Sequence, residues 1–354
     1  HLFQIQADGT GLRQLTDGAY NDFDPCELPS GRLAFISERR GGYGRCHGRP
    51  VPSFTLHSML PDGSDIVALS PHETNEWQPS VDWNGMLAYT RWDYVDRGHT
   101  QAHHAWTTYP DGRDPRAVHG NFRTSLRHAP TMEMDVRAIP DSRHYVATAA
   151  AHHGQAYGSL ILIDPRARDD DDMAPVKRLT PDQALPETEC SAHRDPLRFA
   201  TPWPLSEQVY LCVYDRHSRS DQGPRNNYGI YLIDAFGNRE LIYRDPAISC
   251  LSPLPLQARA KPATIPHATL VGLPPGQEMA GLLPKTAIIG VNNVYSTRRP
   301  FPEGTRITAL RVIQLLPKTT PYADNPRIGY GAQKGARAIL GSVPVEEDGS
   351  VYFN

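Results

Sequence analysis

The stretch DGTGLRQLTDGAYNDFDPCELPSGRLAFIS, residues 8–37, returns 54 positions later as DGSDIVALSPHETNEWQPSVDWNGMLAYTR, residues 62–91. Both copies contain an Asp-Gly turn, a Leu-Thr or Leu-Ser pair, a proline, a second turn glycine and a short apolar strand. This order of turns and strands is typical of one four-stranded blade of a β-propeller. A repeat of this length indicates an array of such units.

Three weaker copies follow, each marked by its turns and its apolar strands. They begin at residues 109–112, 159–164 and 228–234, and the last one ends in the proline-rich stretch 252–266. We therefore expect an all-β protein with a six-bladed β-propeller over residues 1–262. Because residue 1 lies in the middle of a blade, we hypothesise that preceding strands complete the sixth blade. Residues 263–354 are expected to form a truncated, β-rich middle-type domain resembling a small sandwich or barrel.

Composition excludes several classes of function. The net charge of −3 provides no general attraction to nucleic acid or to an anionic membrane. The longest apolar runs have the length of a strand, so the sequence predicts no membrane span. The motifs GxSxG, GxxxxGK[ST] and GxGxxG are absent, which argues against a serine hydrolase and against nucleotide chemistry.

The chain has five cysteines, and none belongs to a CxxC or CxxCH motif. Neither a zinc ribbon nor covalent haem attachment is therefore encoded in these residues. Cys26 and Cys46 flank one blade strand and are the candidates for a disulfide if the protein is exported. Cys212, within the apolar strand VYLCVY, is expected to be a buried small hydrophobic residue.

Eight of the fifteen histidines fall between His99 and His153. Adjacent residues of a strand point to opposite faces, so each His-His pair can offer one ring to a shared site. One hypothesis is a zinc or copper site where loops converge, and its candidate ligands are His103, His104, His152, His153, Cys190 and His193. The alternative is that these rings bind backbone groups or face solvent. Calcium binding by the acidic run 169–172 is a minor alternative to a solvated loop.

A second set of candidate residues comes from the loops expected to face the central channel. Asp24, Glu76, Trp77, Asp135 and Glu187 are predicted to line a polar binding funnel. Paired acid and base roles would require separations that the sequence does not provide. The sequence therefore leaves any catalytic residues unassigned.

The repeat ADGTGLRQLTDG…DPCELPSGRLAFISERR resembles that of the TolB-type, WD-repeat-like six-bladed propellers over about residues 2–259. A narrower resemblance comes from RRGGYGRCHGRPVPSFTLHSM, HETNEWQPSVD, YTRWDYVDR, YGIYLIDAFGNRELIYRD and ILGSVPVEEDGSVYF. These stretches are similar to the exported planctomycete-type proteins related to the hydrazine synthase alpha subunit. That resemblance implies a propeller, a β-rich middle domain and c-type haem segments, and it spans nearly the whole chain. Because CxxCH is absent here, the family's redox chemistry would need haem supplied by a further C-terminal part.

Three hypotheses about function remain open. The first is a non-haem scaffold in an exported redox protein that is periplasmic or otherwise extracytoplasmic, with other subunits and possible c-type cytochromes as partners. The second is a TolB-like propeller that binds a peptide, a protein or a glycan without catalysis. The third is a metal-dependent hydrolase with its site in the mouth of the propeller, for which chelation or His103→Ala is expected to abolish activity. A propeller alone does not decide among them, because the fold hosts many activities.

Overall fold

The computed structural model describes residues 1–46, 49–94, 102–119, 130, 132–152, 156–167, 175–186, 198–218, 226–268, 288–297, 300–323, 325–329 and 335–354. Every regular element in these ranges is a β-strand, which confirms the all-β prediction. No helix with the length and apolar character needed to cross a bilayer occurs among the described residues.

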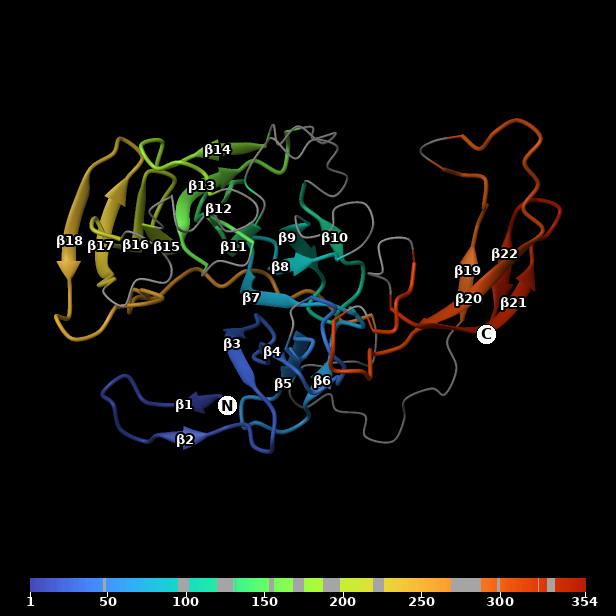
Figure 1. Ribbon diagram of the computed structural model, residues 1–354, viewed down its shortest axis with the longest axis horizontal. Helices are drawn as coiled ribbons and strands as arrows, with labels where there is room; N and C mark the ends of the chain where they lie inside the picture. The colour runs from blue at the N-terminus through green and yellow to red at the C-terminus, as the bar shows by residue number, and fades with distance from the viewer. Residues whose placement is uncertain are drawn as a thin grey trace.

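Four antiparallel units of four strands form four blades of a propeller (Figure 1). The first unit is a separate sheet, and single residue pairs between neighbouring units join the other three into one twelve-stranded sheet. Blade 1 contains β3 (Asp22–Glu27), β4 (Leu33–Ser37), β5 (Thr55–Met59) and β6 (Val67–Ala68). Blade 2 contains β7 (Glu76–Val81), β8 (Leu87–Trp92), β9 (His103–Thr108) and β10 (Arg116–Ala117). Blade 3 contains β11 (Met132–Ala138), β12 (Tyr145–Ala150), β13 (Gly158–Ile163) and β14 (Val176–Arg178). Blade 4 contains β15 (Phe199–Pro204), β16 (Val209–Tyr214), β17 (Gly229–Asp234) and β18 (Arg239–Tyr243).

The sequence repeat and the blade are out of step by two strands. β1 (Phe3–Gln4) pairs with β2 (Arg13–Gln14), and the 54-residue offset makes this pair equivalent to β5 and β6. Each repeat therefore supplies the outer two strands of one blade and the inner two of the next. The apolar strand VYLCVY at residues 209–214 is β16, the second strand of blade 4. Because each repeat spans two blades, the chain links the outer strands of one blade covalently to the inner strands of the next.

The hydrophobic core lies between consecutive blades. Between blades 1 and 2, Ile36 and Leu56 pack against Leu87 and Tyr89. The next two interfaces are built in the same way from apolar residues of blades 2 and 3 and of blades 3 and 4. Cys212 belongs to the last of these clusters and is fully buried, which confirms its expected role as a small hydrophobic residue.

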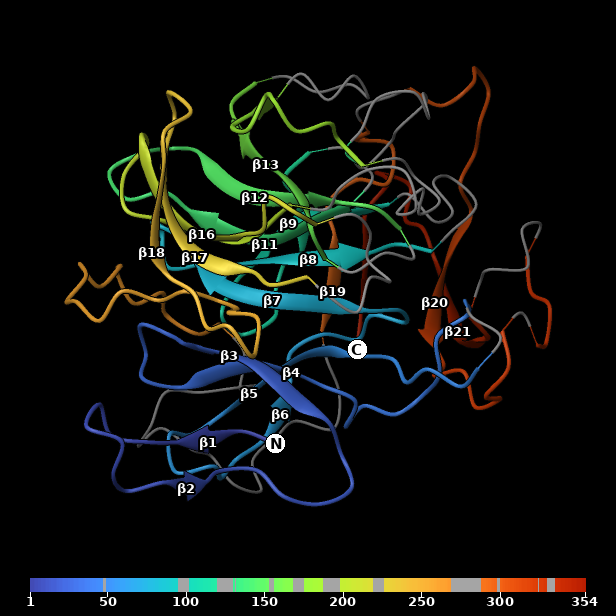
Figure 2. The ribbon, with the colours of Figure 1, turned by 60° about the vertical axis from the view of Figure 1, so that its left-hand side comes forward.

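The first strands of the four blades, β3, β7, β11 and β15, neighbour one another around the axis of the propeller. Figure 2 shows the blades following one another in chain order. Each first strand has a bulge, at which Asp24, Gln78, Asp135 or Thr201 takes a positive φ. Bulges of this kind re-aim side chains, and here they repeat at the same step of every blade.

The Asp-Gly turns pack closely against the backbone of the preceding blade. A Cβ at Gly63 would lie 2.2 Å from the carbonyl oxygen of Leu15, and one at Gly112 would lie 2.1 Å from that of Leu69. Both glycines also have positive φ, at 91° and 80°. Only glycine allows this approach of turn to backbone, which explains why the Asp-Gly turn and the Leu of the Leu-Thr or Leu-Ser pair recur together in the repeat.

We expect Gly112→Ala to destabilise the fold by about 3 kcal/mol, because it combines a strained φ with a backbone clash. Gly237→Ala is the matched control. Gly237 has a φ of 99° but nothing within 4 Å of an added Cβ, so its cost is expected to be about 1 kcal/mol. Urea unfolding of the two variants measures the difference, and equal losses would contradict the proposed contact between blades.

After blade 4 the described residues 244–268 run back across the sheets without forming strands (Figure 1). Thr264 donates a hydrogen bond to the carbonyl oxygen of Pro29, and Arg113 donates one to that of Pro266. The boundary expected at residues 262–263 lies within this segment and stays a prediction. Two antiparallel ribbons follow, and they consist of β19 (Ile289–Val291) with β22 (Val351–Phe353) and β20 (Ala309–Leu315) with β21 (Arg337–Pro344).

Candidate metal centre

A buried polar contact recurs where the outer part of one blade meets the first strand of the next. At the joint of blades 1 and 2, Glu76 of β7 accepts hydrogen bonds from Leu56 N and from Ser70 Oγ, both at 2.8 Å. Glu76 is fully buried. We call this contact a clasp, because one carboxylate joins a strand and a loop of the preceding blade.

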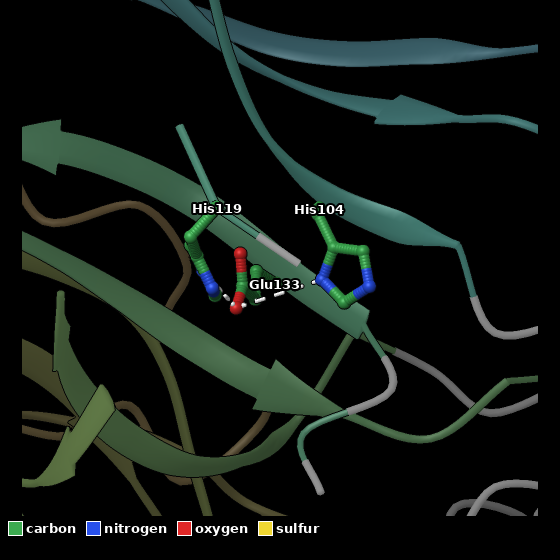
Figure 3. Close-up of side chains that lie close together, drawn as sticks. All are labelled: His104, His119 and Glu133. Carbon is green, nitrogen blue, oxygen red and sulfur yellow. Dashed lines mark ion pairs between the residues drawn. The ribbon is translucent and has the colours of Figure 1, made fainter. Parts of the chain in front are cut away.

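The joint of blades 2 and 3 has the same clasp with different side chains. Glu133 of β11 stands where Glu76 stands, and its Oε2 accepts a hydrogen bond from Ala105 N at 2.9 Å. The position of Ser70 is taken by His119, whose Nε2 lies 2.6 Å from Glu133 Oε1. His104 of β9 approaches the same oxygen with its Nδ1 at 3.7 Å (Figure 3).

All three groups are removed from solvent. The exposed fractions are 2% for His104, 5% for His119 and 0% for Glu133. Burial alone would raise the pKa of Glu133, but the nearby rings of His119 and His104 outweigh burial and hold that pKa well below its usual range. Among the described residues, neither ring nitrogen of His104 has a hydrogen-bond partner. Because burying an unpartnered polar group is costly, this ring lacks an interaction that a bound cation would provide.

The other joints show what is special about this one. The residues equivalent to His104 are His1, Thr55 and Ser159, and those equivalent to His119 are Thr16, Ser70 and Thr180. In two of these joints the hydroxyl itself caps the strand, since Thr16 accepts from Leu2 N and Thr180 from Leu160 N. Within the described ranges, His104, His119 and Glu133 form the one group of three or more potential metal ligands.

The three ligand atoms lie within 4.8 Å of one another. Tetrahedral zinc, with bonds of about 2.0–2.2 Å, places its ligand atoms roughly 3.4 Å apart. Small movements of the two rings would therefore fit the site to such an ion. Two imidazoles and one carboxylate favour zinc or another divalent transition metal, whereas calcium prefers a shell of oxygen ligands.

The structure separates the predicted histidine ligands. His103 points to the face of β9 opposite His104, as the alternation rule predicted, and stacks on Trp92 with ring centroids 4.7 Å apart. His152 lies against His103 at 5.0 Å. These two rings thus belong to an aromatic cluster that includes Trp77. His153, Cys190 and His193 lie outside the described residues.

The structure places the predicted funnel residues at different points of the fold. Asp24 and Asp135 lie at equivalent bulges around the axis, and burial raises the pKa of both carboxyls, that of Asp135 to about 6. Glu76 instead forms a clasp between blades, and Trp77 stacks on His103. The prediction was wrong for these two because it assumed that the loop before the first strand faces the channel. Glu187 lies outside the described residues.

The expected disulfide is not formed, because Cys26 carries a free thiol. Cys26 pairs with Ala34 near the start of β4, whereas Cys46 lies in the loop beyond the end of that strand. The two cysteines are therefore at opposite ends of β4. Burial raises the pKa of the Cys26 thiol to about 11, so it is a poor nucleophile at neutral pH.

Sequence reasoning missed His119 and Glu133. A signal was present, since Val118-His119 occupies the place of the Leu-Thr and Leu-Ser pairs and Glu133 occupies that of Glu76. Aligning the third repeat with the second at this position would have shown a histidine in place of a hydroxyl. The extra residues between 119 and 133 hide this alignment, because they change the spacing from 6 residues (70 to 76) to 14 (119 to 133).

Comparison with known proteins supports the fold. No protein-family model and no curated protein matches the chain. Among solved structures, hydrazine synthase of Kuenenia stuttgartiensis matches 99% of this chain with a TM-score of 0.73 and 16% identity. A putative TolB from Agrobacterium tumefaciens matches 70% of this chain and 76% of its own, with a TM-score of 0.45 and 12% identity. The chain spans about half (53%) of the matched hydrazine synthase chain. At this identity the likeness establishes the propeller architecture, as the sequence repeat predicted.

Proposed function

We propose that this chain is a non-catalytic propeller scaffold, braced by a divalent transition metal ion held by His104, His119 and Glu133. The main support for this proposal is that one of the recurring clasps has metal-ligating side chains at all three of its positions. Zinc is the first candidate, because its coordination suits two imidazoles and a carboxylate. The ion would join β9 and the loop after β10 in blade 2 to β11 in blade 3.

A structural role fits this site better than hydrolysis. Catalytic zinc keeps an open position for water and substrate, whereas these three ligands are almost completely buried between two blades. The equivalent clasp of Glu76 and Ser70 performs the same joining with hydrogen bonds alone. The hydrolase hypothesis also relied on His103, which stacks on Trp92 on the other face of the strand.

We expect the purified chain to bind about one equivalent of zinc and His104→Ala to bind at least tenfold more weakly. Metal analysis after dialysis against zinc, and competition with a coloured chelator, measure both quantities. His144→Ala is the control. His144, between β11 and β12, pairs with Glu207, between β15 and β16, at a partly exposed site. Equal zinc affinities of the wild type and His104→Ala would contradict the proposal.

We further propose that the scaffold works within an exported redox protein that has other subunits. The likeness to hydrazine synthase over nearly the whole chain supports this proposal, as does the apolar outer edge of blade 4. Leu241, Ile242 and Tyr243 of β18 are each about half exposed, at 46%, 56% and 55%. Apolar residues gathered on an outer strand are typical of a protein interface.

A tagged chain purified from its native host tests the scaffold role. The chain is expected to retain a haem-bearing partner through purification. Once separated from that partner, the chain should show no Soret band, since it lacks CxxCH. Tyr243→Glu should release that partner without changing zinc binding. Loss of the partner with Tyr243→Glu but not with Phe236→Glu, at an exposed turn, would place the contact on β18. Retention in both variants would refute the contact.

A further inference from the structure

The joint of blades 2 and 3 is fastened by side-chain hydrogen bonds that lie beside the candidate metal ligands. Thr90 of β8 is fully buried, and its Oγ1 donates a hydrogen bond to the carbonyl oxygen of Glu133 at 2.5 Å. Ser80 of β7 is also buried, and its Oγ donates to the carbonyl oxygen of Val136 at 2.7 Å. Blade 2 therefore holds the backbone of Glu133 through Thr90 and its carboxylate through Ala105 N.

The hydroxyl of Thr90 reaches across a joint where its equivalents do not. Thr90 pairs with the residue directly before the bulge of its first strand, as Ile36, Thr148 and Val213 do in the other blades. Ile36 and Val213 lie in apolar clusters, and Thr148 donates to the Asp135 carboxylate within its own blade. Within the described ranges, a hydroxyl at this position therefore binds the next blade only at the joint that carries the candidate ligands.

The candidate ligands are enclosed as well as fastened. His104, His119 and Glu133 are each at most 5% exposed, and Figure 3 shows the two rings on either side of the carboxylate. Ala105, the neighbour of His104, belongs with Val136 of β11 to the buried apolar cluster that fills the same joint. Because protein interiors are packed as densely as organic crystals, a hydrated ion needs a local separation of the two blades in order to pass.

We propose that an ion at this centre is kinetically locked, because it can enter or leave only while blades 2 and 3 are locally parted, and that Thr90 is a positioning residue that keeps the joint closed. This inference rests on the proposed metal centre and concerns the rate at which the ion exchanges. A buried hydrogen bond shifts an opening equilibrium by about tenfold, so its loss should speed the exchange by a similar factor. Uptake and release should both become faster, and the affinity for zinc should therefore change less than either rate.

Release of zinc from the loaded, complete chain can be followed after mixing with an excess of a coloured chelator. We expect one slow phase whose rate stays constant when the chelator concentration is raised tenfold, because opening of the joint precedes capture of the ion. Thr90→Val, which removes the hydroxyl and keeps the branched shape, should release zinc at least tenfold faster. Thr90→Ser keeps the donor and should release zinc within about threefold of the wild-type rate. Thr148→Val is the matched control and should release zinc as the wild type does, since that hydroxyl binds within blade 3.

Ser80→Ala loosens the same joint at a second point and keeps the test decisive if Thr90→Val does not fold. It should also speed release, because the carbonyl oxygen of Val136 loses its donor. A release rate that rises in proportion to the chelator concentration would overturn the lock, since the chelator would then reach the bound ion directly. Equal release rates in the wild type and in the folded variants at Thr90 and Ser80 would overturn it as well. Absence of zinc binding by the wild type would instead refute the metal centre itself, and this inference with it.

Discussion

Removing the metal ion is expected to lower the melting temperature of the chain by about 10 °C. An ion that binds only the folded state at a thousand times its Kd stabilises it by about 4.1 kcal/mol. For domains somewhat smaller than this chain, each kcal/mol shifts Tm by roughly 2–4 °C. The effect should be this large because the three ligands come from two blades, so that the joint cannot open without releasing the ion.

Circular dichroism melts of the same sample in zinc and in a chelator measure the shift. His104→Ala provides a comparison in which the effect of the chelator should largely disappear. In zinc it should melt below the wild type, because one ligand is missing. In chelator the gap between the two should shrink to the cost of the cavity and of the lost contact with Glu133, since neither protein then holds an ion. A wild-type Tm that is the same in zinc and chelator would contradict a structural ion.

The sequence predicts which turns and strands make up the blades, because the residues that mark them are close together in the chain. The Asp-Gly turns need a positive φ, and Gly63 and Gly112 have it. The apolar strands between the turns are those that fill the interfaces between blades. Which strands share a sheet is not local, because it depends on hydrogen bonds between neighbouring repeats. The repeat therefore shows four strands per unit without showing that a blade takes two from each of two units.

The metal centre illustrates the same limit at the level of single residues. The excess of histidine pointed to the third repeat, and the alternation of side chains correctly separated His103 from His104. The partners of His104 come from positions 119 and 133, whose separation differs from that of the equivalent residues 70 and 76, so that spacing alone could not select them. Burial decides the chemistry here, and burial depends on how blades 2 and 3 stack.

Glu76→Ala is expected to destabilise the fold by about 4 kcal/mol, although Glu76 was first predicted to line a binding funnel. The substitution leaves Leu56 N and Ser70 Oγ buried without the acceptors that they now have at 2.8 Å. Each buried donor left without an acceptor costs about 1–3 kcal/mol, and the lost side chain leaves a cavity between two blades. Urea unfolding followed by circular dichroism measures the loss.

Glu76→Gln separates the hydrogen bonds from the charge. Burial, the largest influence, raises the pKa of Glu76, so its ionised form is disfavoured at this position. A glutamine keeps an oxygen for Leu56 N, and its amide can donate to Ser70 Oγ once that hydroxyl rotates. Arg91 retains its ion pair with Asp93 at 2.9 Å when the charge of Glu76 is removed. The loss in Glu76→Gln should therefore stay below about 1.5 kcal/mol. Equal losses in the two variants would show that charge, rather than hydrogen bonding, closes this joint, and the equivalence between the clasps of Glu76 and Glu133 would then fail.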